Sequence, residues 1–198
     1  MLTTVRKTAL LLTLLITAGG WRIRSERLAL QPESRLWIEG SSTIRDFTCN
    51  ATLITALVDT RSANAIPQLL VGDKAVVAVD VKVPAEKIDC GNGTMNEHML
   101  RALKAGQSPT ILFRLSSYDI ARSSEVLTGT LNGTLSLGGV QKAVTITTRG
   151  KAEGDVLRVT GATDIRMTDY DLTPPTLMFG RIKVNDKVTV KFDLLLKS

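Results

Sequence analysis

Residues 126–148 read VLTGTLNGTLSLGGVQKAVTITT, and this stretch decides the fold. From Leu127 to Leu137 every second position is leucine or glycine, and the positions between them hold threonine, asparagine or serine. Alternation with a period of two residues is typical of a β-strand with one buried face. The pair Gly138–Gly139 suits a tight turn, and the alternation resumes from Val144. The stretch therefore predicts an antiparallel hairpin.

The same pattern extends in both directions from this hairpin. It recurs in the stretches Arg35–Ile38, Thr43–Val58, Lys74–Val83, Thr110–Ser117, Leu157–Met167 and Val188–Leu196. In the third of these stretches, the expected apolar face holds Val77, Val79, Val81 and Val83. Together with the hairpin this gives about eight strands, and clean alternation favours antiparallel pairing over a buried parallel sheet.

Strands that each carry one apolar face must either pack as two sheets or close into a barrel. Closure leaves no unpaired edge, so we expect a mainly β protein built as an antiparallel eight-stranded barrel. A barrel of this size is filled by side chains or holds one slender ligand. Gly129, Gly133, Gly161 and Thr163 on the inward faces fit a cavity, but glycines also relieve curvature around a solid core. The pattern leaves both interiors open.

One segment has the signals of a short amphipathic helix. Thr94 and Glu97 have the spacing of a capping box, which predicts a helix that runs through Lys104 and stops at Gly106. Its apolar face would pack on the barrel as a lid, and Glu97 would pair with Arg101 one turn later. No pattern predicts a second helix.

The N-terminus reads as a signal peptide. Residues 1–20 hold two cations, a short apolar run and then small residues, and the run is too short to span a bilayer. A retained anchor is the alternative. We expect residues 21–34 to be a linker and residues 35–198 to form the barrel domain.

The net charge of +6 first suggests nucleic acid as a partner. Residues 1–29 hold five cationic side chains and one anionic one, so removing them lowers the charge from +6 to +2. Aromatic residues make up only 4% of the chain, too few for base-stacking platforms. We therefore expect no nucleic-acid partner.

Two cysteines, Cys49 and Cys90, follow the expected signal peptide. In an oxidising compartment an isolated pair predicts a disulfide, with two buried free thiols as the alternative. The two cysteines and His98 offer at most three ligands without the paired spacing of structural zinc sites. The sequence predicts neither a metal nor a cofactor.

Four motifs in order resemble the YceI-like family. The hairpin Gly133–Val144 is similar to the strand, G-V-T-K turn and strand of that family; His98-Met99 followed by PTILF at residues 109–113 resembles its H-L and P-x-I-x-F motifs. The stretches IRMTDY at 165–170 and VNDKVTV at 184–190 resemble its I-x-R-x-D-[FY] region and closing strand. The resemblance covers roughly residues 35–197 and implies an exported, lipocalin-like barrel that binds polyisoprenoids or similar amphiphiles.

These observations favour a lipid-binding protein of the periplasm or the secreted fraction. The side chains expected to line the cavity and contact the apolar chain are Phe113, Leu131, Leu135, Ile165, Val190 and Phe192. Since His98 is the only histidine, we expect a hydrogen-bonding role for it at the barrel mouth and no enzymatic activity. Membrane contact is expected to be transient, and homodimerisation is left open. The alternative function is that of a solid-cored structural or stress-related exported protein without a small ligand.

Overall fold

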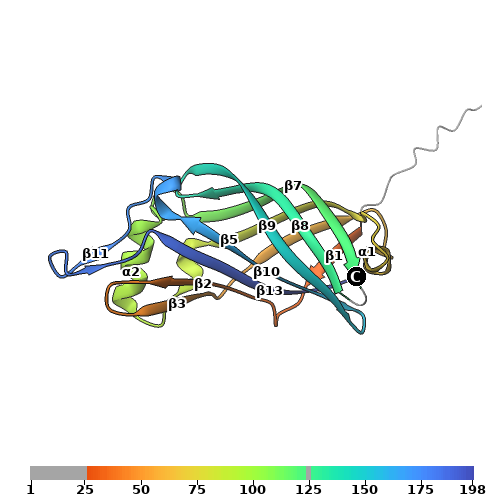
Figure 1. The fold of residues 1–198 in the computed structure, drawn as a ribbon, viewed down its shortest axis with the longest axis horizontal. Coiled ribbons are helices and arrows are strands. Elements are labelled where there is room, and N and C mark those ends of the chain that lie inside the picture. Colours follow the sequence, from red (N-terminus) through yellow and green to blue (C-terminus); the bar gives the residue numbers. More distant parts are fainter. Residues whose placement is uncertain (1–25, 124–125) are drawn as a thin grey trace, which may run out of the picture.

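The computed structural model describes residues 26–123 and 126–198, within which eight antiparallel strands close into one barrel (Figure 1). These strands are β1 (Glu26–Leu30), β4 (Thr55–Thr60), β5 (Val76–Pro84), β7 (Thr110–Ser123), β8 (Val126–Leu137), β9 (Val140–Glu153), β10 (Val156–Arg166) and β13 (Lys187–Lys197). They neighbour one another in the order β1–β4–β5–β7–β8–β9–β10–β13, and β13 pairs with β1 to complete the ring. The mainly β, antiparallel eight-stranded barrel predicted from the sequence is confirmed.

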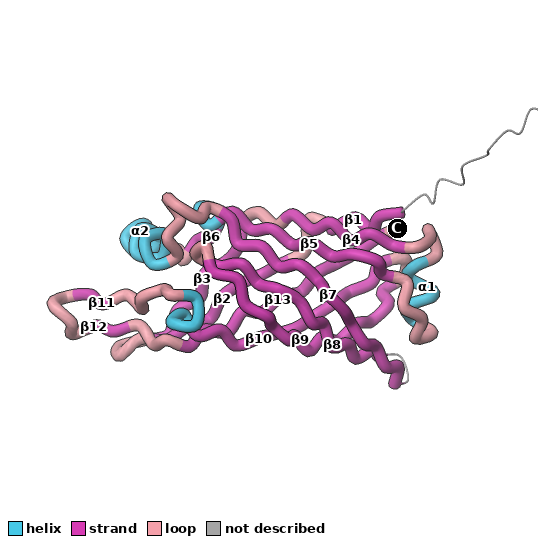
Figure 2. Tube along the Cα trace, turned by 90° about the horizontal axis from the view of Figure 1, so that it is seen from above, coloured by secondary structure: helices cyan, strands magenta, loops and turns pink. Residues whose placement is uncertain are grey.

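Further strands extend the wall at one end of the barrel. β2 (Arg35–Ser41) pairs with the middle of β13, and β3 (Asp46–Ala51) and β6 (Ile88–Asp89) follow it outward. A separate hairpin of β11 (Thr176–Leu177) and β12 (Ile182–Lys183) protrudes beyond the same end (Figure 2).

Strand β1 corrects the boundary of the barrel domain. It lies inside the segment 21–34 that the sequence analysis assigned to a linker, and it closes the ring between β4 and β13. Leu28 on this strand is buried and lies opposite Val58 of β4. A strand of five residues with one buried side chain is too short to show a period of two. The signal peptide expected over residues 1–20 lies outside the described residues.

A register shift in β5 overturns the expected orientation of Val77. The β4–β5 pairing passes from Asp59 opposite Ala78 directly to Thr60 opposite Val76, so Val77 is left unpaired. Its side chain is 60% exposed, whereas Val76 packs toward the core. Placing Val77 on the inward face was wrong, because a bulge inverts the alternation beyond it.

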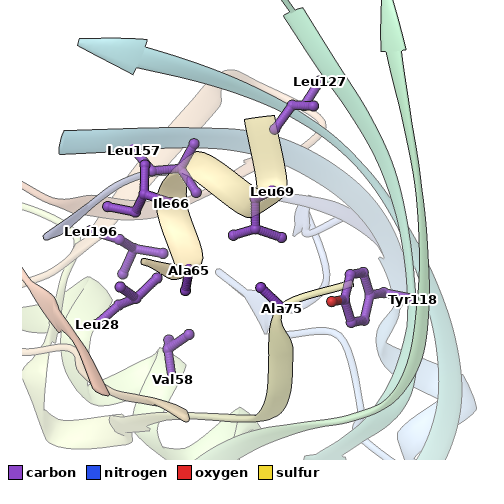
Figure 3. Packing of buried hydrophobic residues seen from close by; sticks show 10 residues of the cluster. All are labelled: Leu28, Val58, Ala65, Ile66, Leu69, Ala75, Tyr118, Leu127, Leu157 and Leu196. Atoms are coloured by element: carbon purple, nitrogen blue, oxygen red, sulfur yellow. The ribbon is translucent and has the colours of Figure 1, made fainter. Parts of the chain in front are cut away.

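The structure contains a helix that the sequence analysis did not predict, α1 (Ala65–Leu70), and it plugs one end of the barrel (Figure 3). Ala65, Ile66 and Leu69 are buried. They pack in a cluster with Leu28, Val58, Ala75, Tyr118, Leu127, Leu157 and Leu196. Pro67 is tolerated because it lies in the first turn, where its missing N–H costs no helical hydrogen bond. We call this the plug end.

The predicted amphipathic helix is present as α2 (Gly93–Ala102) at the opposite end, which we call the lid end (Figures 1 and 2). Its N-cap is Asn92, whose side chain accepts a hydrogen bond from the Met95 N–H at 3.0 Å. The expected capping role of Thr94 was wrong, because the extended backbone that precedes the helix ends at Asn92. The helix also ends before the expected stop at Gly106.

The expected ion pair between Glu97 and Arg101 is found on the exposed face of α2, at 3.8 Å. No helix within residues 26–123 and 126–198 is long and apolar enough to span a membrane.

Candidate functional site

An apolar cavity of about 430 Å³ lies inside the barrel between α1 and α2. Every strand of the closed ring contributes to its wall, as do β2, β3 and α2. The sequence left the interior open between hollow and solid, and the structure has a hollow one. This volume is equivalent to about 14 water molecules at the ~30 Å³ that each occupies in the liquid, and so suits an apolar chain of roughly that many carbon atoms.

The six side chains proposed from the sequence to contact a ligand all lie in the wall of this cavity. They come from four strands: Phe113 from β7, Leu131 and Leu135 from β8, Ile165 from β10, and Val190 and Phe192 from β13. Ile165 and Val190 pack with Leu137, Met167, Tyr170 and Leu172 at the lid end. Leu131 instead packs against the cluster around α1 at the plug end. The six therefore follow the length of the lumen and do not form a single patch.

Three phenylalanine rings lie over glycines of a neighbouring strand. A Cβ atom on Gly161 would collide with the ring of Phe192, its partner across the β10–β13 pair. A Cβ on Gly133 would come within 2.6 Å of the Phe113 ring, and one on Gly40 would be 2.8 Å from Phe47 Cε2. The glycines thus let the rings lie against the wall, so that these large side chains do not fill the lumen. The glycines Gly133 and Gly161 were ambiguous in the sequence, and this packing explains them.

Few polar side chains reach the cavity, and Tyr118 and Thr148 among them are bonded to backbone groups of the protein. At the plug end the Tyr118 hydroxyl accepts a hydrogen bond from the Val76 N–H at 3.0 Å and thereby pairs a backbone group at the β5 bulge. Burial raises the pKa of the Tyr118 phenol, so it stays protonated at neutral pH. On the wall, the Thr148 hydroxyl donates to the Gly129 carbonyl at 3.3 Å.

The lid end is the polar end of the cavity. Ser42, Arg45 and His98 line it there, next to Met99 of α2. His98 makes the expected hydrogen bond at the mouth, since its Nδ1 lies 2.8 Å from a guanidinium nitrogen of Arg101. A ligand with one apolar chain and one polar group would therefore fit with its chain toward α1 and its polar group toward α2.

Cys49 and Cys90 form the disulfide predicted from the sequence. Cys49 of β3 is buried, and Cys90 directly precedes the turn into α2. Met95 and Met99 of α2 pack against the same small cluster. The bond therefore ties the start of the lid helix to the barrel wall at the mouth.

Charged side chains gather on the outer face of the barrel. Asp193 of β13 is buried there and receives two hydrogen bonds from Arg158, at 2.8 and 2.6 Å, which lower the pKa of its carboxyl. Asp164 likewise has a lowered pKa because Lys187 and Thr189 bond to it. Within the described ranges no group of three or more His, Cys, Asp or Glu side chains is arranged to hold a metal ion.

Comparison with known proteins assigns the chain to a family. The model of the YceI-like domain matches residues 33–196, which is most of the chain. The chain belongs to the YceI-like family. This confirms the resemblance recognised in its motifs. No curated protein sequence matches the chain.

Solved structures share the YceI-like barrel at low sequence identity. BcnA from Burkholderia cenocepacia has a TM-score of 0.64 and 16% identity, and the match covers 84% of this chain and 99% of that one. A polyisoprenoid-binding domain from Saccharophagus degradans, implicated in plant cell wall breakdown, has a TM-score of 0.60 and 13% identity over 87% and 97% of the two chains. The YceI protein of Campylobacter jejuni has a TM-score of 0.58 and 16% identity over 97% and 99%. At such low identity, the TM-scores show a common fold and nothing further.

Two parts of the cavity wall were missed from the sequence. Phe47 of β3 packs over Gly40, its partner across the β2–β3 pair, and the sequence analysis predicted neither this pairing nor a role for Phe47. Leu177 and Ile182 of the β11–β12 hairpin also line the cavity. Two prolines before that hairpin and Gly180 within it signal a turn, but strands of two residues show no period.

Proposed function

We propose that this YceI-like protein binds a polyisoprenoid or a similar amphiphile, holds its apolar chain inside the barrel, and performs no catalysis. The observation that carries the proposal is the apolar cavity of about 430 Å³, which is plugged by α1 at one end and lined by polar groups at the other. The polyisoprenoid-binding domain of Saccharophagus degradans, which shares the fold, supports the choice of ligand class.

Apolar burial supplies the affinity in this proposal. Each methylene that leaves water contributes about 0.8 kcal/mol, so about ten methylenes would contribute roughly 8 kcal/mol. Less the cost of ordering the chain, this corresponds to binding in the micromolar range or weaker. The lumen recognises a chain by its length and cross-section, because its wall offers few hydrogen-bonding groups.

The side chains that face the cavity support binding without catalysis. Among the described residues that line it, the titratable side chains are Arg45, His98 and Tyr118, and none is a carboxylate. Arg45 and His98 lie at the mouth and Tyr118 at the plug. General acid–base catalysis needs a proton donor and a proton acceptor within reach of the same reacting bond, and the two side chains suited to these roles, His98 and Tyr118, lie at opposite ends of the cavity.

Export belongs to the proposal as well. The Cys49–Cys90 disulfide fits an oxidising compartment, and residues 1–20 have the pattern of a signal peptide. We infer a periplasmic or secreted location. N-terminal sequencing of exported material tests this, and an intact Met1 in that fraction would contradict cleavage.

Mass spectrometry of an organic extract of protein purified without detergent tests the ligand. We expect an amphiphile with a long apolar chain in stoichiometric amount, and the stripped protein should bind a fluorescent isoprenoid analogue saturably. Protein that carries no lipid and shows no saturable binding would refute the proposal and favour a structural role without a small ligand.

A further inference from the structure

The hairpin β11–β12 and the turn 42–45 form an exposed apolar tip at the lid end. Phe179 is fully exposed, Met178 is 65% exposed, and Ile44 on the neighbouring turn is 63% exposed. Thr43 joins the two segments, since its N–H donates to the Lys183 carbonyl at 3.0 Å. Figures 1 and 2 show this hairpin projecting from the barrel past α2. We refer to residues 42–45 and 176–184 as the tip.

The backbone at the tip holds these apolar side chains outward at a cost. Met178, Phe179 and Gly180 have consecutive positive φ angles of 50°, 55° and 88°. The left-handed region is unfavourable for residues other than glycine, asparagine and aspartate. Two large apolar residues therefore occupy a disfavoured conformation and bury little surface within the chain, so intramolecular packing does not account for them.

The tip is also cationic. Arg45, Arg181 and Lys183 are exposed, and none of them forms a salt bridge with any residue in the part of the chain that the structure describes. The acidic residues nearest to the tip in the sequence are Asp46, next to Arg45, and Asp186, whose carboxylate accepts hydrogen bonds from Thr168. Exposed apolar side chains ringed by unpaired cations are the pattern of a surface that contacts anionic lipid headgroups.

The apolar surface of the tip is continuous with the cavity. Leu177 and Ile182, which flank the turn, line the cavity, and so does Ile44. An apolar chain that leaves the lumen at the lid end would therefore meet these side chains before it met water. The mouth and the tip face the same surroundings.

We propose that the tip docks the protein on an anionic lipid bilayer, with Ile44, Met178 and Phe179 inserted between headgroups and the three cations against the phosphates. The docked mouth opens into the apolar layer, which gives a chain a dry route between bilayer and barrel. The purpose of docking rests on the proposed function, but the docking itself depends only on the surface of the tip.

Cosedimentation with vesicles tests the proposal. The full exported protein is mixed with vesicles of phosphatidylcholine alone or with phosphatidylglycerol, at low and high salt. We expect binding to the anionic vesicles that weakens with salt, because the attraction of surface charges is screened. Met178→Ser with Phe179→Ser should reduce the partition coefficient roughly tenfold or more. Arg181→Gln with Lys183→Gln should reduce it roughly 30-fold on anionic vesicles.

Matched controls come from other surfaces of the same chain. Val71, near the plug, is 63% exposed, and Val77 is 60% exposed, so Val71→Ser with Val77→Ser removes two exposed apolar side chains away from the tip. Arg61→Gln with Lys151→Gln removes two exposed cations away from the tip. Both control variants should bind vesicles as the parent protein does.

Three outcomes would overturn the proposal: no binding to anionic vesicles, equal loss in tip and control variants, or a tip that mediates self-association in sedimentation velocity without vesicle binding. Titration with the fluorescent isoprenoid analogue in solution separates this result from the proposed function. Tip variants that take up the analogue normally but do not bind vesicles support docking. If the protein takes up the analogue saturably but does not bind vesicles, docking is overturned and the proposed binding function is unaffected.

Discussion

Filling the lumen from its wall gives the sharpest test of the cavity. Leu135 of β8 lines the cavity and is only partly buried, and Leu131 lies on the same face of the strand, four residues closer to the plug. Leu135→Phe adds three carbons to the side chain in the lumen. If this displaces about one methylene of a bound chain, the loss is about 0.8 kcal/mol, or about a fourfold rise in Kd. Adding Leu131→Phe should bring the rise to about 15-fold.

The Leu135→Phe substitution should not lower the stability of the protein, whereas in a solid core it would. In a well-packed interior, the larger side chain costs about 1–3 kcal/mol. In a cavity of about 430 Å³ the ring occupies free space, so we expect the melting temperature of lipid-free protein to stay constant or rise. Leu57 provides the matched control, since it is 38% exposed on the outer face of β4. Leu57→Phe should alter neither binding nor stability.

Fluorescence titration with an isoprenoid analogue and thermal melts of the same samples measure the two effects. The reasoning about the lumen would be refuted by a sharp drop in the melting temperature of Leu135→Phe together with a parent protein that shows no saturable binding. It would also be refuted by a Leu57→Phe variant that weakens binding as much as Leu135→Phe does.

Three further predictions concern the wall. Replacing Cys49 and Cys90 with serine should lower the free energy of unfolding by about 4 kcal/mol in the chain-entropy model for a sequence separation of 41, as measured by urea denaturation without reductant; an unchanged midpoint would contradict it. Asp193→Asn should cost about 1–2 kcal/mol at pH 7. Because folding lowers the pKa of Asp193, this advantage of the parent is complete above the unfolded pKa of about 3.9 and is lost as the pH falls through the folded pKa. Denaturation at pH 7 and at acidic pH checks this, and a gap that does not depend on pH would speak against it. Gly161→Ala should push the Phe192 ring into the lumen and weaken analogue binding about fourfold. Unchanged affinity would contradict this and show that the ring moves without entering the lumen.

The sequence predicted the barrel because its long strands carry a clean period. Leu127, Leu131 and Leu135 recur on one face of a strand of twelve residues, and burial of that face allows a single register. The same alternation placed six side chains in the cavity wall without any knowledge of strand order, since closure turns every apolar face inward. The disulfide was predictable because the sequence offers one pair of cysteines.

The features that the sequence did not reveal are short or depend on tertiary structure. Strand β1 has five residues and α1 has six, so neither spans enough periods to be recognised. The bulge at Val77 depends on pairing with β4, which the local sequence does not encode. Asn92 and Thr94 are both good N-caps, and the path of the preceding chain selects Asn92.

The α1 plug makes the barrel a blind tube. A molecule in such a tube can advance only until its leading end meets Leu69 of α1, and it must leave by the route through which it entered. Whatever exceeds the depth of the tube stays outside, among Arg45, His98 and the β11–β12 hairpin. Chains that differ only beyond this depth would be held alike, and selection among them would fall to the groups at the rim.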